Sequence, residues 1–405
     1  MDVMDVAVTE WVSLCLRWLH MIAAMAWIGA SFYFIHLDLA LQPVASTGGR
    51  EADAWEVHGG GFYRAIKYMV APQQLPQRFT WFIWEAYTTW LSGFALLVVI
   101  YYWNADLFLI DPGVMTLTPP QAIGISIATL VAALLVYEAM CRSPLGQNED
   151  LLAAVGFVFL VALCWGFTKV YSGRGVFMQM GAIIGTIMAA NVFLVIIPGQ
   201  KKTVAAMAAG EVPNPKWGAD GKQRSVHNNY LTLPVVFLMI SNHYPLMFGT
   251  RYNWVIFAVV MVLGFLIRHF YNLRHAGRPN PWWAWVAAAI GMAAVAWMSL
   301  SGARTSSEAA AAAPKVSFAD VQDIVLSRCS MCHAAQPVWE GIPTAPRDVR
   351  LDTPENIRLH AREIELYAVL SNAMPPGNIT GLTDEERQKL AAGLRDLAPA
   401  RLSER

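Results

Sequence analysis

The stretch VFMQMGAIIGTIMAANVFLVIIP, residues 176–198, contains no charged side chain and is long enough to cross a lipid bilayer as a helix. Seven more apolar stretches of similar length lie in the first 300 residues, at about 11–36, 79–103, 120–140, 151–171, 230–250, 253–272 and 282–300. Hydrophobic residues make up 56% of the 405 and charged residues only 14%, well below the charged share of soluble domains. The sequence therefore predicts an all-α fold, a polytopic membrane bundle of about eight transmembrane helices.

Beyond the last apolar stretch lies Cys329-Ser330-Met331-Cys332-His333, which has the C-x-x-C-H spacing of a c-type haem attachment site. The thiols of Cys329 and Cys332 would bond the haem, and His333 would be an axial ligand of its iron. The alternative is a zinc site, but the chain after His333 offers only His360 and no further cysteine. The motif therefore predicts covalently bound haem c and electron transfer.

The second iron ligand is expected on a loop downstream of this motif. Met374 fits, because it lies in Asn372–Gly377, where two prolines keep the chain out of a helix. A helix start at Thr383–Glu386, leading to Leu397, follows. This order resembles a small class I cytochrome c over about residues 317–400.

Lysine and arginine are distributed unevenly between the spans. Loops after odd-numbered spans hold twelve of these residues and the segments on the other side hold three. Because basic loops stay in the cytoplasm, both ends of the chain are expected outside it. The first ten residues hold three acids and no base, which does not fit a signal peptide. We expect a bacterial inner-membrane protein whose N-terminus and C-terminal cytochrome domain are periplasmic, where such haems are attached.

The composition divides the chain into three parts. Residues 1–300 are expected to form the transmembrane catalytic domain, and 317–405 the cytochrome c domain. Between them, 301–316 is rich in Ala and Ser, including the run Ala309–Ala313, and is expected to be a tether that lets the carrier move.

Two histidines could bind a second haem inside the bundle. His20 and His243 fall at similar depth on the first and sixth spans, so both could ligate a haem b below the cytochrome. The alternative is that each histidine is hydrogen-bonded within the bundle.

A second polar cluster is expected near the cytoplasmic face. Its members are His36, Asp38, His58, Arg78, Glu85, Glu138, His227, Asn228, Asn229, Arg268 and His269. Glu85, His58 and His227 are the candidate catalytic bases, and Arg78 is the candidate substrate-binding cation. The glycines Gly59–Gly61 are expected to add flexible backbone. The alternative is that these are ordinary interface anchors.

The order Trp18-Leu19-His20 followed by Trp27-Ile28-Gly29-Ala30-Ser31-Phe32-Tyr33-Phe34, eight spans and a C-terminal C-x-x-C-H motif resembles the membrane-bound cytochrome c urate oxidases. The resemblance covers essentially the whole chain. It implies oxidation of urate to 5-hydroxyisourate in purine catabolism, with water as the oxygen source. It also implies that electrons leave through the fused cytochrome to a respiratory-chain acceptor, not to dioxygen.

Two other function classes remain open. The first-span pattern also resembles small membrane haem proteins that oxidise porphyrinogens, so the reductant could be a quinol or a porphyrinogen. The membrane part could instead be a mere anchor, although one helix would suffice for that. Basic and acidic residues are balanced at 29 each, and no basic patch points to a nucleic-acid partner.

Overall fold

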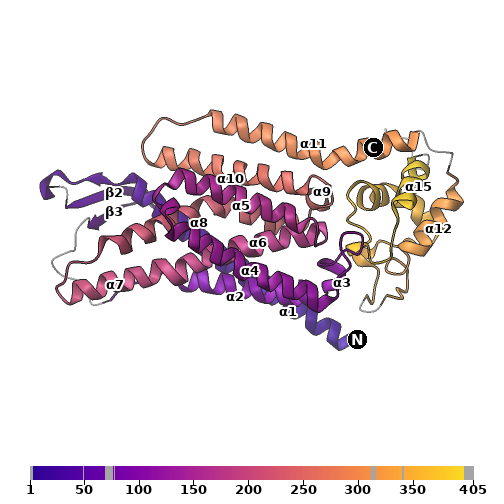
Figure 1. The fold of residues 1–405 in the computed structure, drawn as a ribbon, viewed down its shortest axis with the longest axis horizontal. Helices are drawn as coiled ribbons and strands as arrows, with labels where there is room; N and C mark the ends of the chain where they lie inside the picture. Colours follow the sequence, from indigo (N-terminus) through magenta and orange to yellow (C-terminus); the bar gives the residue numbers. More distant parts are fainter. Residues whose placement is uncertain are drawn as a thin grey trace.

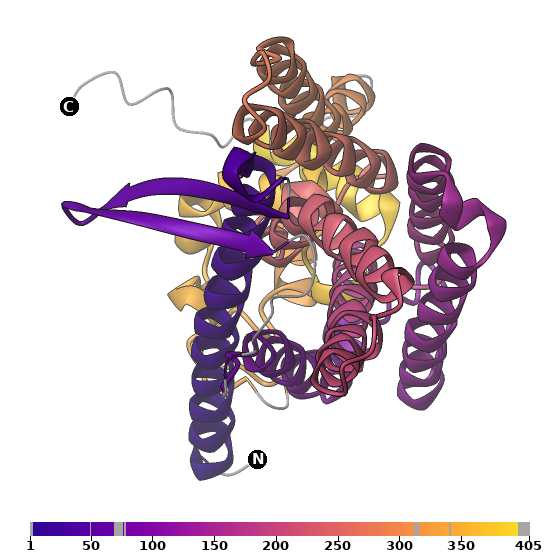
Figure 2. The same ribbon diagram turned by 90° about the vertical axis from the view of Figure 1, so that its left-hand side faces the viewer.

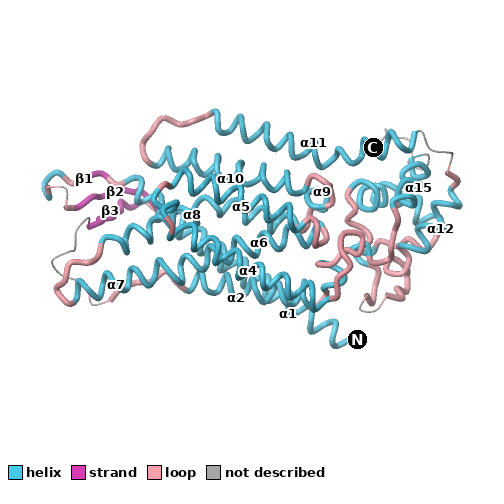
Figure 3. Tube along the Cα trace, in the orientation of Figure 1, coloured by secondary structure: helices cyan, strands magenta, loops and turns pink. Residues whose placement is uncertain are grey.

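Long helices that run side by side along one axis make up most of the protein (Figure 1). The computed structural model describes residues 3–48, 50–68, 76, 78–311, 316–339 and 342–395. A small β-sheet lies at one end of the bundle, which we call the hairpin end (Figure 3). At the other end lies a smaller, loop-rich part formed by the described residues of 316–395, which we call the C-terminal unit. The chain's N-terminus lies at that same end (Figure 1).

Eight long helical segments of the described chain form the bundle. They are α1 Val3–Ala40, α2 Trp84–Leu96 with η2 Leu97–Tyr102, α4 Pro119–Arg142, α5 Glu149–Phe167, α6 Gly173–Ala190 with η4 Asn191–Ile196 and α7 Ile197–Ala208, α8 Pro215–Ser241, α10 Asn253–His275 and α11 Trp283–Ala311. Short helical turns, α3 Ala105–Phe108, η3 Pro144–Gln147 and α9 Pro245–Phe248, lie in the connections.

Most of the predicted spans coincide with helices apolar enough to cross a membrane. Six such stretches lie in the described residues: Ala7–Ala40, Pro119–Arg142, Glu149–Phe167, Gly173–Ala208, Asn253–His275 and Trp283–Leu300. The other two predicted spans fall on α2 with η2 and on the second half of α8. The span predicted at 230–250 is too long, because α8 ends at Ser241 and Pro245 begins the separate turn α9.

The uncharged stretch 176–198 is the central helix of the bundle. Val176, Phe177, Met180 and Ile184 of α6 are fully buried, and α6 packs against α2, α4, α5 and α8. A helix that is apolar on every side is stable only when it is surrounded. The outer helices instead expose large apolar side chains, Val131 and Leu135 on α4 and Val158 and Trp165 on α5, as expected of a surface in contact with lipid.

A β-hairpin between α1 and α2 is the element that the all-α prediction missed. β2 Glu51–His58 pairs antiparallel with β3 Gly61–Tyr68, and the two-residue strand β1 Gln42–Pro43 adds to β2. Gly59 and Gly60 have positive φ values of 57° and 79°, so they form the tight turn and not a flexible loop. Seen from the hairpin end, the hairpin projects sideways past α1 (Figure 2).

The C-terminal unit has an apolar core of its own. α12 Phe318–Arg328 and α15 Asp384–Arg395 pack together through buried residues that include Val321, Val325, Leu390 and Leu394. Short segments lie between them: η5 Pro346–Asp348, α13 Pro354–Leu359, α14 Ala361–Ile364, η6 Glu365–Leu370 and η7 Pro376–Asn378. The predicted helix start at Thr383 is confirmed, because its side chain and that of Glu386 cap α15 reciprocally. The predicted end at Leu397 lies outside the described residues.

The C-terminal unit packs against the bundle. α11 is helical as far as Ala311, through most of the segment expected to be a tether, and contacts α15 and η6. A Cβ atom at Gly249 of the bundle would overlap the backbone carbonyl of Ser371, and one at Gly377 would lie 2.5 Å from the Ile110 carbonyl oxygen. The structure therefore holds the unit in one close-fitting position, where a freely moving carrier was expected.

Candidate functional site

Two large cavities lie at opposite ends of the bundle. The hairpin cavity, about 1170 Å³, lies among the ends of α1, α8 and α10 and the start of α7, beside β3. The interface cavity, about 810 Å³, lies between the C-terminal unit and the bundle. α10 contributes Asn253 to the interface cavity and His269 to the hairpin cavity. These residues are sixteen positions apart on one helix, so about 24 Å separates the two cavities along it.

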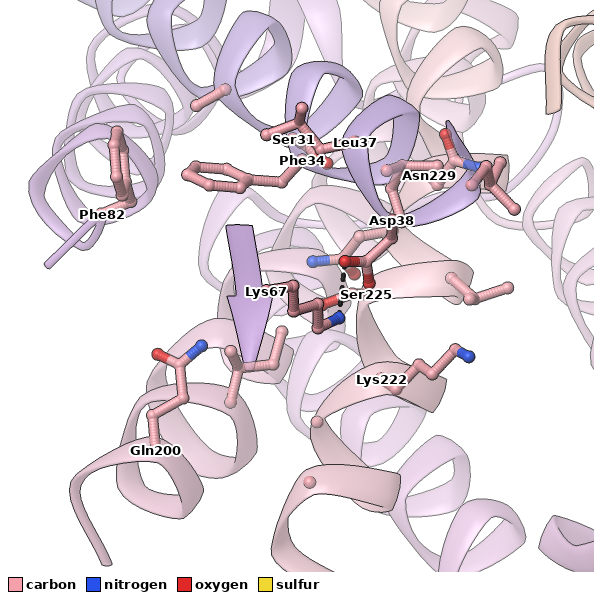
Figure 4. A pocket seen from close by; sticks show the side chains of 18 of the residues that line it. Ser31, Phe34, Leu37, Asp38, Lys67, Phe82, Gln200, Lys222, Ser225 and Asn229 are labelled. Carbon is pink, nitrogen blue, oxygen red and sulfur yellow. Dashed lines mark hydrogen bonds and ion pairs between the residues drawn. The ribbon is translucent and has the colours of Figure 1, made fainter. Parts of the chain in front are cut away.

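Aromatic rings and polar side chains line the hairpin cavity together (Figure 4). The rings of Phe34 on α1 and Phe82 before α2 meet edge to face, with centroids 4.9 Å apart. The polar residues of the lining include Ser31, Asp38, Lys67, Gln200, Lys222, Ser225, Asn228, Asn229 and His269. Such a mixture of flat apolar walls and a few polar groups is typical of small-molecule sites.

Positive charge exceeds negative charge in the described lining of this cavity. Lys67 and Asp38 form an ion pair, with Nζ and Oδ1 2.6 Å apart, so their charges cancel (Figure 4). Lys222 and Arg278 also line the cavity, and neither has an acidic partner within salt-bridge distance among the described residues. The cavity therefore has the electrostatics of an anion site.

A buried arginine fixes one wall of the hairpin cavity. Arg268 is only 4% exposed, donates two hydrogen bonds to Oδ1 of Asn229, one of them 2.8 Å long, and lies over the ring of Phe32. With its oxygen occupied in this way, Asn229 keeps its side-chain NH₂ as a donor. His269, the next residue on α10, stacks on Phe265 in the same part of the bundle.

A buried polar network connects to the cavity through Asn228. Asn191 donates to Oδ1 of Asn228 at 2.9 Å and to the hydroxyl of Tyr137 at 3.0 Å, and that hydroxyl is 2.7 Å from Nδ1 of His227. Arg224 joins it through a weak 3.5 Å contact to Asn191 and an ion pair with Glu138, 2.9 Å. His227, a candidate base, is therefore in a hydrogen-bonded network behind the cavity, not in its lining.

The other candidate residues are scattered. His58 is exposed at the tip of the hairpin, next to the Gly59-Gly60 turn, and contributes to neither cavity. Glu85, in the first turn of α2, has its buried Oε2 atom without a hydrogen-bond partner in the described structure. Arg78 is exposed and does not line the hairpin cavity, whereas the next residue, Phe79, does.

The sequence anticipated part of the hairpin cavity. Asp38, Asn228, Asn229 and His269 were expected near this end of the bundle, and the structure brings all four into one lining. Lys67 and Lys222 were missed as site residues, and both had been counted only as loop charges. The sequence feature that could have located Lys67 is the Gly59-Gly60 pair, which predicts a tight turn followed by a strand that contains this lysine.

The residues expected to hold haem c come together in the interface cavity. Cys329, Cys332, His333 and Met374 all line it, and neither cysteine forms a disulfide. Nδ1 of His333 is 2.8 Å from the carbonyl oxygen of Val349, so this nitrogen donates and Nε2 is available to a metal. Burial raises the pKa of the Cys329 thiol to about 12. Donor types, available nitrogen and cavity all fit a covalently attached haem.

A buried arginine holds the Met374 loop in place. Arg387 of α15 donates to the carbonyl oxygens of Ala368 and of Met374, the latter at 3.1 Å, and to Asn378 at 3.3 Å. The backbone N–H of Met374 donates to Tyr367, 2.8 Å. Burial lowers the pKa of Arg387 from its usual value, and Asp384 and Asp111 partly offset the effect.

The two histidines considered for haem b have different surroundings. Nδ1 of His20 is 3.0 Å from the carbonyl oxygen of Thr89, and its ring packs on Gly93, so it joins α1 to α2. His243 is exposed after the end of α8 and lines the interface cavity, which His20 does not. The described contacts bring His20 to α2 and not to His243, and haem b stays a prediction.

Comparison with known families gives one match. A family model described as "Urate oxidase N-terminal" matches residues 6–299, which is more than half of the chain and spans the helix bundle up to α11. The match ends before the C-terminal unit. No curated protein and no solved structure shows a match to the chain.

Proposed function

This chain belongs to the urate oxidase N-terminal family, and from that membership we propose that it oxidises urate to 5-hydroxyisourate. We further propose that the electrons pass to a c-type haem held by the C-terminal unit and then to a respiratory-chain acceptor. The observation that carries the proposal is the family match over residues 6–299. The C-x-x-C-H motif and the apolar helices support the haem and the membrane location.

The overall reaction balances without dioxygen. Urate is a monoanion at neutral pH, and loss of two electrons makes a ring carbon electrophilic. Water attacks that carbon, a C–O bond forms, and one proton leaves, which gives neutral 5-hydroxyisourate. The haem, when bound, supplies a one-electron acceptor, so each urate needs two successive transfers.

Four residues of the interface cavity would hold the haem, two by covalent bonds and two as ligands of its iron. Cys329 and Cys332 would bond it covalently, and His333 and Met374 would face its iron. The hydrogen bond from His333 to Val349 orients the imidazole. Arg387 holds the backbone of Met374, so the thioether is positioned by the fold.

The decisive experiment is anaerobic mixing of the purified protein with urate while the haem absorption bands are followed. We expect urate to reduce the haem without oxygen and 5-hydroxyisourate to form, one molecule per two electrons. If dithionite reduces the haem and urate does not, the proposal is wrong. Reduction by a quinol or a porphyrinogen alone would assign the chain to that alternative. Urate consumption that requires oxygen and produces peroxide would refute the haem as acceptor.

A further inference from the structure

We propose that the hairpin cavity is the binding site for a flat, anionic heterocycle, with Lys222 as its anion contact and Asn229 as a fixed amide donor. This inference rests on the proposed function and assigns its substrate, urate, to the end of the bundle opposite the C-terminal unit. None of the candidate residues taken from the sequence for this role, Arg78, Glu85, His58 and His227, lines the cavity.

Charge is the first argument. Among the acids and bases of the described lining, Asp38 is paired with Lys67, which leaves Lys222 and Arg278 in excess. Lys222 extends from the first half of α8, on the same helix as Ser225 and Asn229 (Figure 4). An ammonium group without an acidic partner beside hydrogen-bond donors attracts a monoanion and repels a cation.

Shape and hydrogen bonding are the second argument. Phe34 and Phe82 give the cavity apolar ring faces and edges, against which a planar heterocycle can pack. Ser31, Gln200 and Ser225 line the same space, and no hydrogen bond of their side chains is found among the described residues. A heterocycle that carries several carbonyl and N–H groups could use these donors and acceptors together.

The wall around Asn229 is rigid. Its oxygen accepts both bonds from buried Arg268, and Arg268 also donates to Asn272 at 3.2 Å. The Asn229 amide therefore cannot flip without breaking these bonds. A preorganised donor costs little entropy when a ligand binds, so Asn229 would fix the orientation of the heterocycle.

The test measures urate binding with the haem kept reduced by dithionite, so that urate cannot be oxidised. Equilibrium dialysis gives Kd for wild type, Lys222→Gln and Lys222→Arg. The matched control is Lys216→Gln, on the same helix but outside the cavity and paired with Asp220. We expect Lys222→Gln to weaken binding about five- to tenfold at low salt, less at high salt, and Lys222→Arg to bind nearly as wild type.

A second variant fills the space instead of removing a charge. Ser225→Trp should obstruct the cavity and abolish urate binding, while dithionite still reduces the haem. If wild type oxidises urate and both Lys222→Gln and Ser225→Trp bind it with unchanged Kd, the site lies elsewhere and only this inference fails. The inference is equally overturned if Lys216→Gln weakens binding as much as Lys222→Gln. If wild type neither binds urate nor is reduced by it, the proposed function fails.

Discussion

Single residues set the properties of the electron acceptor in the proposed mechanism. Met374 lines the interface cavity, and its backbone is held by hydrogen bonds to Tyr367 and from Arg387. We expect Met374→Ala to leave the haem attached through Cys329 and Cys332 but to lower its midpoint potential and so slow its reduction by urate, since thioether ligation favours ferrous iron. Potentiometric titration measures the shift. An unchanged potential with unchanged axial-ligand bands would move the ligand to another residue.

Glu386 makes the C-terminal unit sensitive to acid. Burial alone would raise the pKa of Glu386. The hydrogen bond from the Thr383 backbone and the ion pair with Arg328 outweigh burial and hold this pKa below its ordinary 4.5. Its stabilisation of the α15 start is therefore complete above about pH 4.5 and is lost as pH falls through the lower folded-state value.

The corresponding test compares hydrogen exchange in α15 between wild type and Glu386→Gln at each pH. We expect the variant to be less protected at pH 7 by about 1 kcal/mol or less, and the difference to vanish in acid. Glu385→Gln is the control, because Glu385 is exposed and forms its ion pair with Lys389. A difference that persists below pH 3 would contradict the role of Glu386.

At the scale of elements, the helices followed from the sequence and the hairpin did not. Residues 176–198 were predicted to be a membrane helix because they are long, apolar and uncharged, and their two buried polar residues, Gln179 and Asn191, find hydrogen-bond partners inside the bundle. Trp55, Val57, Phe62 and Ile66 lie on one face of the hairpin and are exposed, and the charged residues Asp53 and Arg64 interrupt that face, so the apolar alternation that marks a core-facing strand is incomplete. Its signal was the Gly59-Gly60 pair, which favours a tight turn.

The contact between α9 and the C-terminal unit gives a prediction for docking. In Gly249→Val the new side chain would collide with the Ser371 backbone, which cannot rotate away. We expect the unit to separate from the bundle, so that urate reduces the haem at least tenfold more slowly while ascorbate reduces it as before. Stopped-flow absorbance measures both rates.

Gly166→Val is the matched control for this variant. Gly166 lies near the end of α5, and a Cβ atom at this position would meet no other described part of the protein within 4 Å, apart from its own stretch of helix. Equal urate-driven rates in Gly249→Val and Gly166→Val would show that docking does not limit electron transfer.

At the scale of the whole molecule, the site depends on residues far apart in sequence. Phe34, Lys67, Lys222 and His269 come from α1, β3, α8 and α10, and only the packed bundle brings them together. Counting charges along the chain pointed to the end of the bundle where the hairpin cavity lies. The charge count could not distinguish Lys222 from the other lysines between the spans. The rotation of each helix about its own axis decides which side chains line a cavity, and the sequence does not fix that rotation.

Sidedness follows from the position of the two cavities. If the hairpin end faces the cytoplasm, as the charge distribution predicts, and the hairpin cavity is the urate site, as we propose, urate would enter from that side. In sealed inverted vesicles without a urate carrier, we expect external urate to reduce the haem promptly, and in right-side-out vesicles about tenfold more slowly or not at all. Dithionite-reducible haem in both preparations serves as the control. Equal rates from both sides would contradict this assignment.

The separation of about 24 Å between the cavities would also make the proposed reaction electrogenic. Electrons released at the hairpin end and collected at the C-terminal end would cross most of the membrane's electric field. Each electron that moves from a negative interior to the outside would release up to about 2.3 kcal/mol of free energy per 100 mV of membrane potential. Urate oxidation would then run faster in energised cells and discharge part of the voltage that respiration builds.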